Sequence, residues 1–331
     1  MKVKSSAPTR IDLAGSTLDI WPLYLFHTHS QTINLTINLF ATCEIETRSD
    51  RVIRIESRDT GFEFEGTLST LPQDSSLRLI SELINFFQPS GGLNLTTQCS
   101  APVGSGLGGS SALSIAIAKA LNELVGRRYS DRELLLITQN VETKVIRVLT
   151  GVQDYYSAMY GGLNAIHLKV DGIELEPLNT DLQMLHECMV LCYSGKPHFS
   201  GTNNWDITKR YIEGDAVLPE HLGRICDIAA QMRQALIKND LKKVAQHLDE
   251  EWRVRKLLSS GISIPKIEHL VKVASGVGLL GAKVCGAGGG GCTVFIVERG
   301  KKAAVESALA AAGGEVLDYR IVTSGVKVIV E

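Results

Sequence analysis

The sequence predicts an α+β protein of two domains, and three observations support this. Its 331 residues, 44% of them hydrophobic, can bury more core than one compact domain usually holds. Strand-like and helix-like segments follow one another in mixed order, without the strict alternation of a parallel βαβ fold. Apolar periodicity weakens near 179–187, which places a boundary between a first domain over 1–180 and a second over 181–331.

The first hundred residues have the pattern of strands interrupted by one helix. Apolar residues occupy every second position over 33–39, and a short β-branched run covers 52–57. A helix is expected over 74–87, because an Asp/Ser pair can cap its start and leucine and phenylalanine recur at helical spacing. Residues 93–100 return to a strand pattern.

A glycine-rich loop leads into two expected helices, from about Ser111 to Leu124 and from about Asp131 to Leu149. The segment 150–162, TGVQDYYSAMYGG, then breaks the helical pattern. Strands are expected at 162–169 and 173–178, which completes the first domain.

The second domain is expected to open with a strand at 188–193 and a polar loop at 194–205. Three helical stretches follow between about 220 and 278, and a second glycine cluster covers 286–291. After this cluster we expect a strand, a helix and two further strands, which complete the second domain.

Charge and composition argue for a small-molecule partner. Lys and Arg number 34 against 36 Asp and Glu, so the chain has no overall positive field to attract nucleic acid or an acidic membrane. We see neither a signal peptide nor an apolar run near the ~20 residues of a membrane span. The seven scattered cysteines suit a reducing compartment. We therefore expect a cytoplasmic monomer or homodimer.

The loop APVGSGLGGSSA, 101–112, holds four glycines and three serines between a strand and a helix. Unpaired N–H groups at a helix N-terminus can bind phosphate, and glycine lets the ligand approach the backbone. Gly104, Gly106 and Gly109 fit the dinucleotide fingerprint, but the expected second strand with its acidic residue is missing. The Walker pattern fails because no Lys precedes Ser110. A tight turn without a ligand is the remaining alternative.

The same segment resembles the motif P-x-x-x-G-L-G-x-S-S-A of the GHMP kinases, which include galactokinase, homoserine kinase, mevalonate kinase and phosphomevalonate kinase. Residues 7–22 and 281–297 resemble the first and third motifs of that family, in the right order. The resemblance implies a ribosomal-protein-like N-terminal domain, a ferredoxin-like C-terminal domain, and ATP and Mg²⁺ as cofactors. It assigns ATP binding to Pro102, Gly104, Ser105, Gly106, Leu107, Gly108, Gly109, Ser110, Ser111 and Ala112.

The first motif is most similar to that of the sugar anomeric kinases. Pro8, Arg10, Gly15 and Asp19 fit its pattern, whereas mevalonate kinases carry Lys at the position of Arg10. Residues 16–18 read Ser-Thr-Leu, where galactokinases have Glu-His-Thr and heptose kinases have Gly-Gly-Thr. The resemblance implies a sugar or sugar phosphate as acceptor, with heptose 7-phosphate or another monosaccharide as the first expectation.

Three residues are expected to hold Mg²⁺, which usually takes one or two protein carboxylates together with phosphate and water. Ser110 and Ser111 stand at the helix start, where a hydroxyl can ligate the metal; simple helix capping is their alternative role. Glu142 lacks an oppositely charged residue four positions away, which argues against a helix-surface ion pair but leaves a solvated glutamate possible. The resemblance favours Glu142 as the metal-binding glutamate of this helix.

Asp154 matches the Gly-x-x-Asp element of the family, which implies that it is the catalytic base. A carboxylate that accepts the acceptor's proton lowers the barrier to phosphoryl transfer. The resemblance places Arg10 beside it, where a guanidinium keeps the carboxylate ionised and favours the developing alkoxide. A turn residue following Gly151 is the alternative for Asp154.

The acceptor is expected to lie against the first and third motifs. Asp19 matches the position where sugar kinases place a carboxylate on acceptor hydroxyls, with Gly15 beside it. Gly288, Gly289 and Gly290 belong to a run of five glycines in six positions, which no single turn type requires. In the family that this motif resembles, the segment lies against the phosphate loop and shapes the nucleotide and acceptor cleft, so the resemblance assigns these glycines to acceptor binding. A flexible apolar turn is the alternative.

The leading hypothesis is therefore an ATP- and Mg²⁺-dependent kinase that phosphorylates a sugar, at the anomeric hydroxyl. A mevalonate-type alcohol kinase is the alternative within the class. From other classes, a dinucleotide-dependent dehydrogenase predicts nicotinamide binding without Mg²⁺, and a non-catalytic nucleotide or sugar sensor predicts binding without ADP release.

Overall fold

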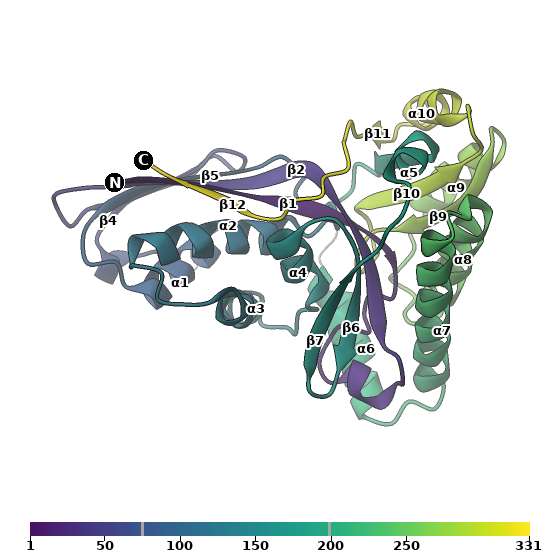
Figure 1. Cartoon of the computed structure of the whole chain (residues 1–331), viewed down its shortest axis with the longest axis horizontal. Coiled ribbons are helices and arrows are strands. Elements are labelled where there is room, and N and C mark those ends of the chain that lie inside the picture. The colour runs from purple at the N-terminus through teal and green to yellow at the C-terminus, as the bar shows by residue number, and fades with distance from the viewer. Residues whose placement is uncertain (74–75, 198–199) are drawn as a thin grey trace.

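A computed structural model of the chain describes residues 1–73, 76–197 and 200–331. Two sheets and their helices make up these residues, as Figure 1 shows. The first sheet extends across the left and centre of the view, with helices beneath it, and the second sheet lies at the upper right. This arrangement confirms the expected α+β class.

The larger sheet has the strand order β12-β1-β2-β5-β3-β4, and β6 pairs with both β2 and β7. Only the pair β3 and β5 is parallel in the described part of this sheet. Its strands are β1 (Lys2–Ala14), β2 (Gln31–Thr47), β3 (Ile53–Ser57), β4 (Phe62–Gly66), β5 (Leu93–Cys99), β6 (Leu163–Lys169), β7 (Gly172–Pro177) and β12 (Lys327–Val330).

Strand β2 is long enough to pair with two different strands along one edge. Its first part, 31–35, pairs with β6, and its second part, 41–47, pairs with β5. Because the register between β1 and β2 shifts on both sides of 9–12, the two strands bend together there. The bend brings residues 10–12 of β1 to the junction of the two halves of the molecule.

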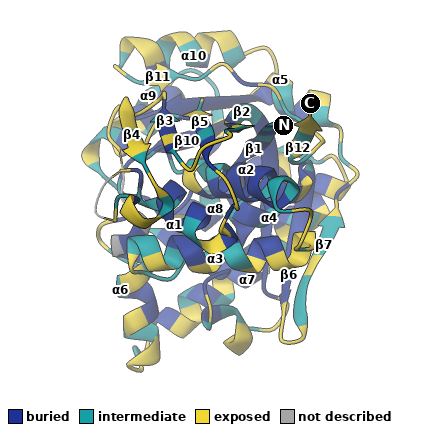
Figure 2. Cartoon of the chain, turned by 90° about the vertical axis from the view of Figure 1, so that its left-hand side faces the viewer, coloured by how far each residue is buried: buried dark blue, intermediate teal, exposed yellow. Residues whose placement is uncertain are grey.

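Four helices cover one face of the larger sheet: α1 (Arg78–Phe87), α2 (Gly109–Leu124), α3 (Asp131–Ile146) and α4 (Gln153–Tyr160). Helix α2 is apolar on most of its surface, which is why it lies at the centre of this layer and is largely buried in Figure 2. Helix α3 begins with a capping box between Ser130 and Glu133 and ends where Arg147 turns left-handed, at φ 62°.

The smaller sheet is antiparallel in the order β11-β8-β10-β9. Its strands are β8 (Met189–Tyr193), β9 (Leu279–Val284), β10 (Cys292–Val297) and β11 (Glu315–Val316). The helices of this half are α5 (Leu182–Cys188), α6 (Ser200–Ile212), α7 (Leu218–Ile237), α8 (Leu241–Arg255), α9 (Pro265–Ser275) and α10 (Lys302–Ala311). Two short 3₁₀ turns, Leu23–Phe26 and Leu68–Thr70, complete the described elements.

The two sheets share a hydrophobic core. Ile11 and Leu35 of the larger sheet belong to the same buried cluster as Leu191 and Val294 of the smaller sheet. Strand β12, although last in the chain, pairs with β1 in the larger sheet. The predicted domain boundary between residues 180 and 181 therefore remains a prediction. No helix in the described residues is both long and apolar enough to span a membrane.

Most predicted elements agree with the structure, but several differ. Residues 179–187, where the apolar pattern weakens, contain most of helix α5, and strand β9 was not predicted. Residues 150–162, expected as a break, contain the eight-residue helix α4, which is too short for a clear apolar periodicity. The polar loop expected over 194–205 is partly replaced by α6, whose 13 residues are mainly polar. The helix expected from 74 begins at Arg78, and the Asp/Ser pair at 74–75 lies outside the described residues.

Candidate active site

The predicted phosphate loop lines a cavity of about 340 Å³. The opposite walls come from the segment 16–20 after β1, from Glu142 on α3 and from the connection 149–154 into α4. Gly286 and Ala287 close one side. Segments from distant parts of the chain thus meet at one cleft.

The loop ends at Gly108, which has a φ of 74° and stands at the N-cap of α2. Gly108 has no side chain to cap the first turn of this helix, and the other described side chains do not cap it either, which leaves its first N–H groups for an anion. A Cβ at Gly108 would lie 3.0 Å from Cγ of Asp154, so a glycine is needed both for the backbone and for this approach. The helix start and the predicted base are therefore neighbours.

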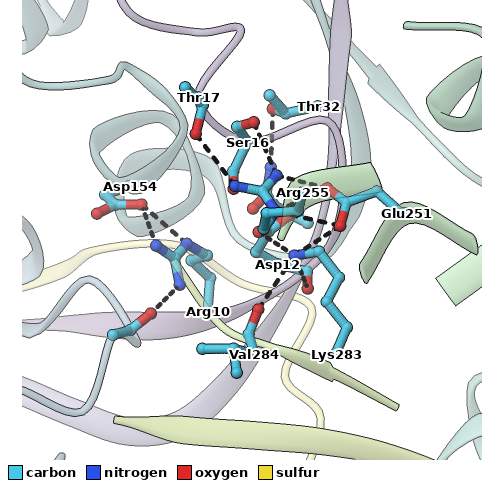
Figure 3. Close-up of polar contacts among 12 residues, drawn as sticks. Arg10, Asp12, Ser16, Thr17, Thr32, Asp154, Glu251, Arg255, Lys283 and Val284 are labelled. Carbon is cyan, nitrogen blue, oxygen red and sulfur yellow. Dashed lines mark hydrogen bonds and ion pairs between the residues drawn. The ribbon is translucent and has the colours of Figure 1, made fainter. Parts of the chain in front are cut away.

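Arg10 and Asp154 form the ion pair that the sequence predicts. Nε of Arg10 donates to Oδ1 of Asp154 at 2.8 Å, and Nη2 lies 2.6 Å from the same oxygen. Nη1 donates to the carbonyl of Gly106 at 2.6 Å, which fixes the guanidinium against the loop. Burial opposes the charge of Arg10, but the attraction of Asp154 and Asp12 raises its pKa. Figure 3 shows this pair to the left of the buried charges discussed below.

Glu142 is buried on α3 and is surrounded by hydroxyl groups. Ser110 donates to one carboxylate oxygen, and Ser111 donates to the other at 2.9 Å. Tyr155 of α4 also donates to that second oxygen, at 2.6 Å. Burial raises the pKa of Glu142 despite these bonds, and the negative charge of Asp154 adds to the effect. No basic side chain forms an ion pair with Glu142 in the described residues.

These residues fit a Mg²⁺ ion bound together with a nucleotide. A buried carboxylate without a cationic partner is costly, and a divalent cation would remove that cost. No group of three or more His, Cys, Asp or Glu gathers as a metal cage in the described part of the chain. Mg²⁺ needs no such cage, since it commonly takes one carboxylate and fills its other positions with phosphate oxygens and water.

Asp19 lies across the cleft and is held by the start of α4. One of its carboxylate oxygens accepts the backbone N–H of Gln153 at 2.9 Å. A side chain on Gly151 would overlap that carboxylate, so the glycine leaves the room that Asp19 occupies. Burial, together with the charges of Asp154 and Asp12, raises the pKa of Asp19 to about 6, and the bond from Gln153 only partly offsets this.

Two buried polar atoms near Asp19 have no hydrogen-bond partner within the described ranges. They are Oγ of Ser16, whose residue is 2% exposed, and Oε1 of Gln153, whose residue is 5% exposed. Both residues line the cleft. Buried polar atoms are rarely left unpaired in proteins, so this corner of the cleft suits a ligand with hydroxyl groups.

The second glycine cluster packs against the first. A Cβ at Gly286 would lie 3.0 Å from the carbonyl of Gly106, and Cys292 donates its N–H to Ser105 at 2.7 Å. Gly289 donates to Ile262 instead of facing the cleft. Several predicted residues are not among those that line the cavity, and their assignment remains a prediction: Gly15, Leu107, Ala112, Gly288, Gly289 and Gly290.

Sequence reasoning missed a group of four buried charges beside the site. Lys283 of β9 pairs with Asp12 of β1, and Arg255 pairs with Glu251 one turn earlier on α8. All four residues have an exposed fraction of 0%. Burial disfavours the charge on Asp12, but Lys283, Arg255 and Arg10 lower its pKa overall. Side chains alternate along a strand, so the place of Asp12, two residues beyond Arg10 on β1, could have drawn attention to it. Nothing in the sequence indicates that Asp12 pairs with Lys283.

Two family models match the chain in the expected order. Residues 76–162 match the model described as the GHMP kinases N terminal domain, and residues 232–315 match the one described as GHMP kinases C terminal. The first match contains the glycine loop, Glu142 and Asp154, and the second contains Arg255 and the second glycine cluster.

Individual relatives align over nearly the full length. A D-glycero-alpha-D-manno-heptose 7-phosphate kinase of Campylobacter jejuni is 29% identical, over 98% of each chain. A mevalonate kinase of Thermococcus onnurineus is 25% identical, over 99% of this chain and 98% of its own. The solved structure of a D-glycero-D-manno-heptose 1-phosphate kinase from Bacteroides thetaiotaomicron superposes with a TM-score of 0.80 at 28% identity, over 99% of each chain.

Proposed function

The chain belongs to the GHMP kinase family, and from this premise we propose that it transfers the γ-phosphoryl group of ATP to the anomeric hydroxyl of a sugar phosphate, with a heptose 7-phosphate as the first candidate. Asp154 is the base, Arg10 assists it, and Glu142 with Ser110 and Ser111 holds Mg²⁺. The observation that carries this proposal is the geometry of Asp154 against the start of α2.

Asp154 has one oxygen engaged and one available. Both contacts from Arg10 go to Oδ1, so Oδ2 can accept a proton from an acceptor hydroxyl in the cleft. The acceptor oxygen then forms a bond to the γ-phosphorus, the bond from that phosphorus to the bridging oxygen breaks, and ADP leaves. Arg10 stabilises the negative charge that develops on the acceptor oxygen.

The phosphates of ATP are held by the loop and by the first turn of α2, whose N–H groups have no side-chain cap within the described residues. Glu142, Ser110 and Ser111 supply oxygen ligands for the metal, with Tyr155 orienting the carboxylate. When bound, Mg²⁺ would neutralise charge on the phosphate oxygens. Gly108 permits the close approach between this phosphate site and Asp154.

The acceptor side of the cleft supports a polyhydroxylated substrate. Asp19 offers a carboxylate to two hydroxyl groups, and the unpaired atoms of Ser16 and Gln153 offer further hydrogen bonds. Arg10, in place of the Lys of mevalonate kinases, also favours a sugar. The full-length similarity to the heptose 7-phosphate kinase supports the same class of acceptor.

ADP release with Mg-ATP tests the proposal on a panel of free sugars, 6- and 7-phosphorylated sugars, mevalonate and homoserine. We expect turnover with one sugar phosphate and a loss of kcat of about 10²- to 10⁴-fold in Asp154→Asn, because that range is typical of a missing general base. Asp171→Asn, in the exposed turn between β6 and β7, is the matched control and should keep wild-type kcat.

Other outcomes are equally informative. Turnover of mevalonate alone would replace the sugar with an isoprenoid alcohol. ATP binding without turnover of any acceptor, unchanged in Asp154→Asn, would indicate a sensor and contradict the proposed catalysis.

A further inference from the structure

Arg255 reaches from the second half of the chain to the wall of the acceptor cleft. It is the last residue of α8 and is completely buried. Its Nη1 donates to Oγ1 of Thr17 at 3.0 Å, and its Nη2 donates to the carbonyl oxygen of Ser16 at 2.8 Å. In Figure 3 the guanidinium lies between this turn and Glu251. One side chain thus holds two consecutive residues of the cleft wall.

Thr17 has an unusual backbone conformation. Its φ is 76°, in the left-handed region that β-branched residues rarely adopt. The turn around it is closed by the N–H of Leu18, which donates to Gly15 at 3.3 Å, and by the N–H of Ile20, which donates to Thr17 at 3.2 Å. Such strain persists only where surrounding contacts impose it. The two bonds from Arg255 are contacts of that kind.

The strained turn leads directly into the acceptor site. Ser16, Thr17 and Asp19 all line the cleft, and Asp19 follows the left-handed residue by two positions. A rotation of the turn would therefore move the Asp19 carboxylate and the unpaired hydroxyl of Ser16 together.

The charge of Arg255 is compensated on the side away from the cleft. Its Nε donates to both carboxylate oxygens of Glu251 at 3.1 Å. Glu251 also lies 3.9 Å from Lys283, which pairs with Asp12. Two buried cations and two buried anions balance one another. Nη2 also donates to Glu251, so this nitrogen is shared between the carboxylate and the carbonyl oxygen of Ser16, while Nη1 binds the hydroxyl of Thr17.

We propose that Arg255 is a positioning residue for acceptor binding: it holds the left-handed turn at Thr17 and so places Asp19 and Ser16 toward the substrate. The inference rests on the proposed function for the identity of the acceptor side. It does not require that Arg255 touch the substrate, and it assigns no role to Arg255 in ATP binding.

Arg255→Lys is the main variant, because it keeps the charge opposite Glu251 but loses the planar fork that reaches both oxygens. We expect KM for the sugar acceptor to rise roughly tenfold or more, as for a lost charge-assisted hydrogen bond. KM for ATP should stay within about twofold of wild type. Arg253→Lys, on the exposed side of the same helix, is the matched control and should change neither constant.

A double-mutant cycle separates positioning from general damage. Glycine tolerates the left-handed conformation, so Thr17→Gly removes the strain that Arg255 opposes. We expect Arg255→Lys to raise the acceptor KM much less in a Thr17→Gly background than in wild type. Equal effects in both backgrounds would contradict the proposal. If Arg255→Lys fails to fold, Thr17→Val keeps the side-chain shape, removes the hydroxyl that Arg255 binds, and should raise the acceptor KM by itself.

Hydrogen exchange gives a readout that needs no acceptor. The amides of Leu18 and Ile20 should exchange faster in Arg255→Lys than in wild type, while those of α2 stay unchanged. Unchanged exchange across 15–20 would overturn the inference. Absence of sugar turnover by the wild-type enzyme would instead refute the proposed function, and the exchange experiment would still decide the role of Arg255.

Discussion

At the scale of single residues, two of the carboxylates in the cleft lie against glycines. Asp154 packs on Gly108, and Asp19 packs on Gly151. The site therefore depends on missing side chains as much as on present ones. A methyl group at either glycine would press against a carboxylate. Substitutions at these two positions therefore test how the carboxylates are placed in the cleft.

Gly108→Ala should lower kcat by at least about tenfold, because its methyl group would press on Asp154 from about 3 Å and misplace the proton acceptor. Gly126→Ala is the control, since Gly126 has a similar φ of 81° but open space around it. Both variants lose some stability through the left-handed backbone. Steady-state ADP release should separate them, and equal kcat values would show that Asp154 tolerates the contact.

Asp19 should make acceptor binding sensitive to pH. With its pKa raised to about 6 by burial, Asp19 loses its charge as the pH falls through 6. If the ionised form binds the acceptor, kcat/KM for the acceptor falls about tenfold per pH unit below that point. The same protonation favours the folded state as the pH falls. A pH profile of Asp19→Asn should lack this inflection, and an inflection that persists would have to come from another group.

The candidate residues for chemistry could be chosen from the sequence alone, because each stands in a short motif, and their roles remain proposals. The sequence could not reveal Tyr155 beside Glu142, since a tyrosine on a short helix has no signature for that role. Nor could it pair Asp12 with Lys283, because buried charges find their partners only through the packing of distant strands. Whether Gly288 and its neighbours touch an acceptor stays a prediction.

At the scale of elements, helix α4 carries Asp154 and Tyr155 and is held at its end by the segment before β12. Val326 donates its N–H to the carbonyl of Ala158 at 2.9 Å. Gly325 lies so close to Met159 that a side chain there would overlap its carbonyl. Helix α4, which carries the proposed base, is thus fixed by a segment that follows it by more than a hundred and sixty residues.

Gly325→Ala should lower the free energy of unfolding by about 1–3 kcal/mol, because the added methyl group has no room beside α4. Gly91→Ala provides the comparison, since the nearest atom to its Cβ would be 3.7 Å away. Urea denaturation measures both. A change in Gly325→Ala no larger than that in Gly91→Ala would mean that the crossing segment can shift without cost.

Elements were predictable where their apolar pattern is long and regular, as in α2 and α3. Helix α4 was missed because eight residues make barely two turns, bounded by Gly151 and Gly161. Helix α6 was missed because its sequence is polar and only scattered residues, such as Ile207, are buried. The pairing of β12 with β1 could not be predicted, since strand partners far apart in sequence leave no local signal.

At the scale of the whole molecule, the two sheets are joined by charge as well as by apolar packing. Lys283 of the smaller sheet meets Asp12 of the larger one without access to water. An ion pair in such a place adds little net stability, but removing one partner leaves a buried charge without compensation. The pair therefore penalises any arrangement that separates the sheets at this point.

Lys283→Met should lower the free energy of unfolding by about 3–5 kcal/mol, the usual cost of breaking a buried pair. Adding Asp12→Asn should recover part of the loss, because it removes the uncompensated charge. Lys169→Met breaks an exposed pair with Glu174, which water screens, and should lower the free energy of unfolding far less than Lys283→Met. If equilibrium unfolding gave equal values for the two lysine variants, the Asp12 carboxylate would have to find another partner.

The position of β12 also bears on how the molecule is made. Synthesis runs from the N-terminus, so β1 leaves the ribosome first and its edge partner, 327–330, follows after both halves have been translated. Until then, one edge of β1 offers unpaired N–H and C=O groups, and the end of α4 lacks the segment that crosses it. We therefore expect the nascent chain to be most exposed to association with other strands during translation, since the same late segment both covers that edge and completes the support of α4.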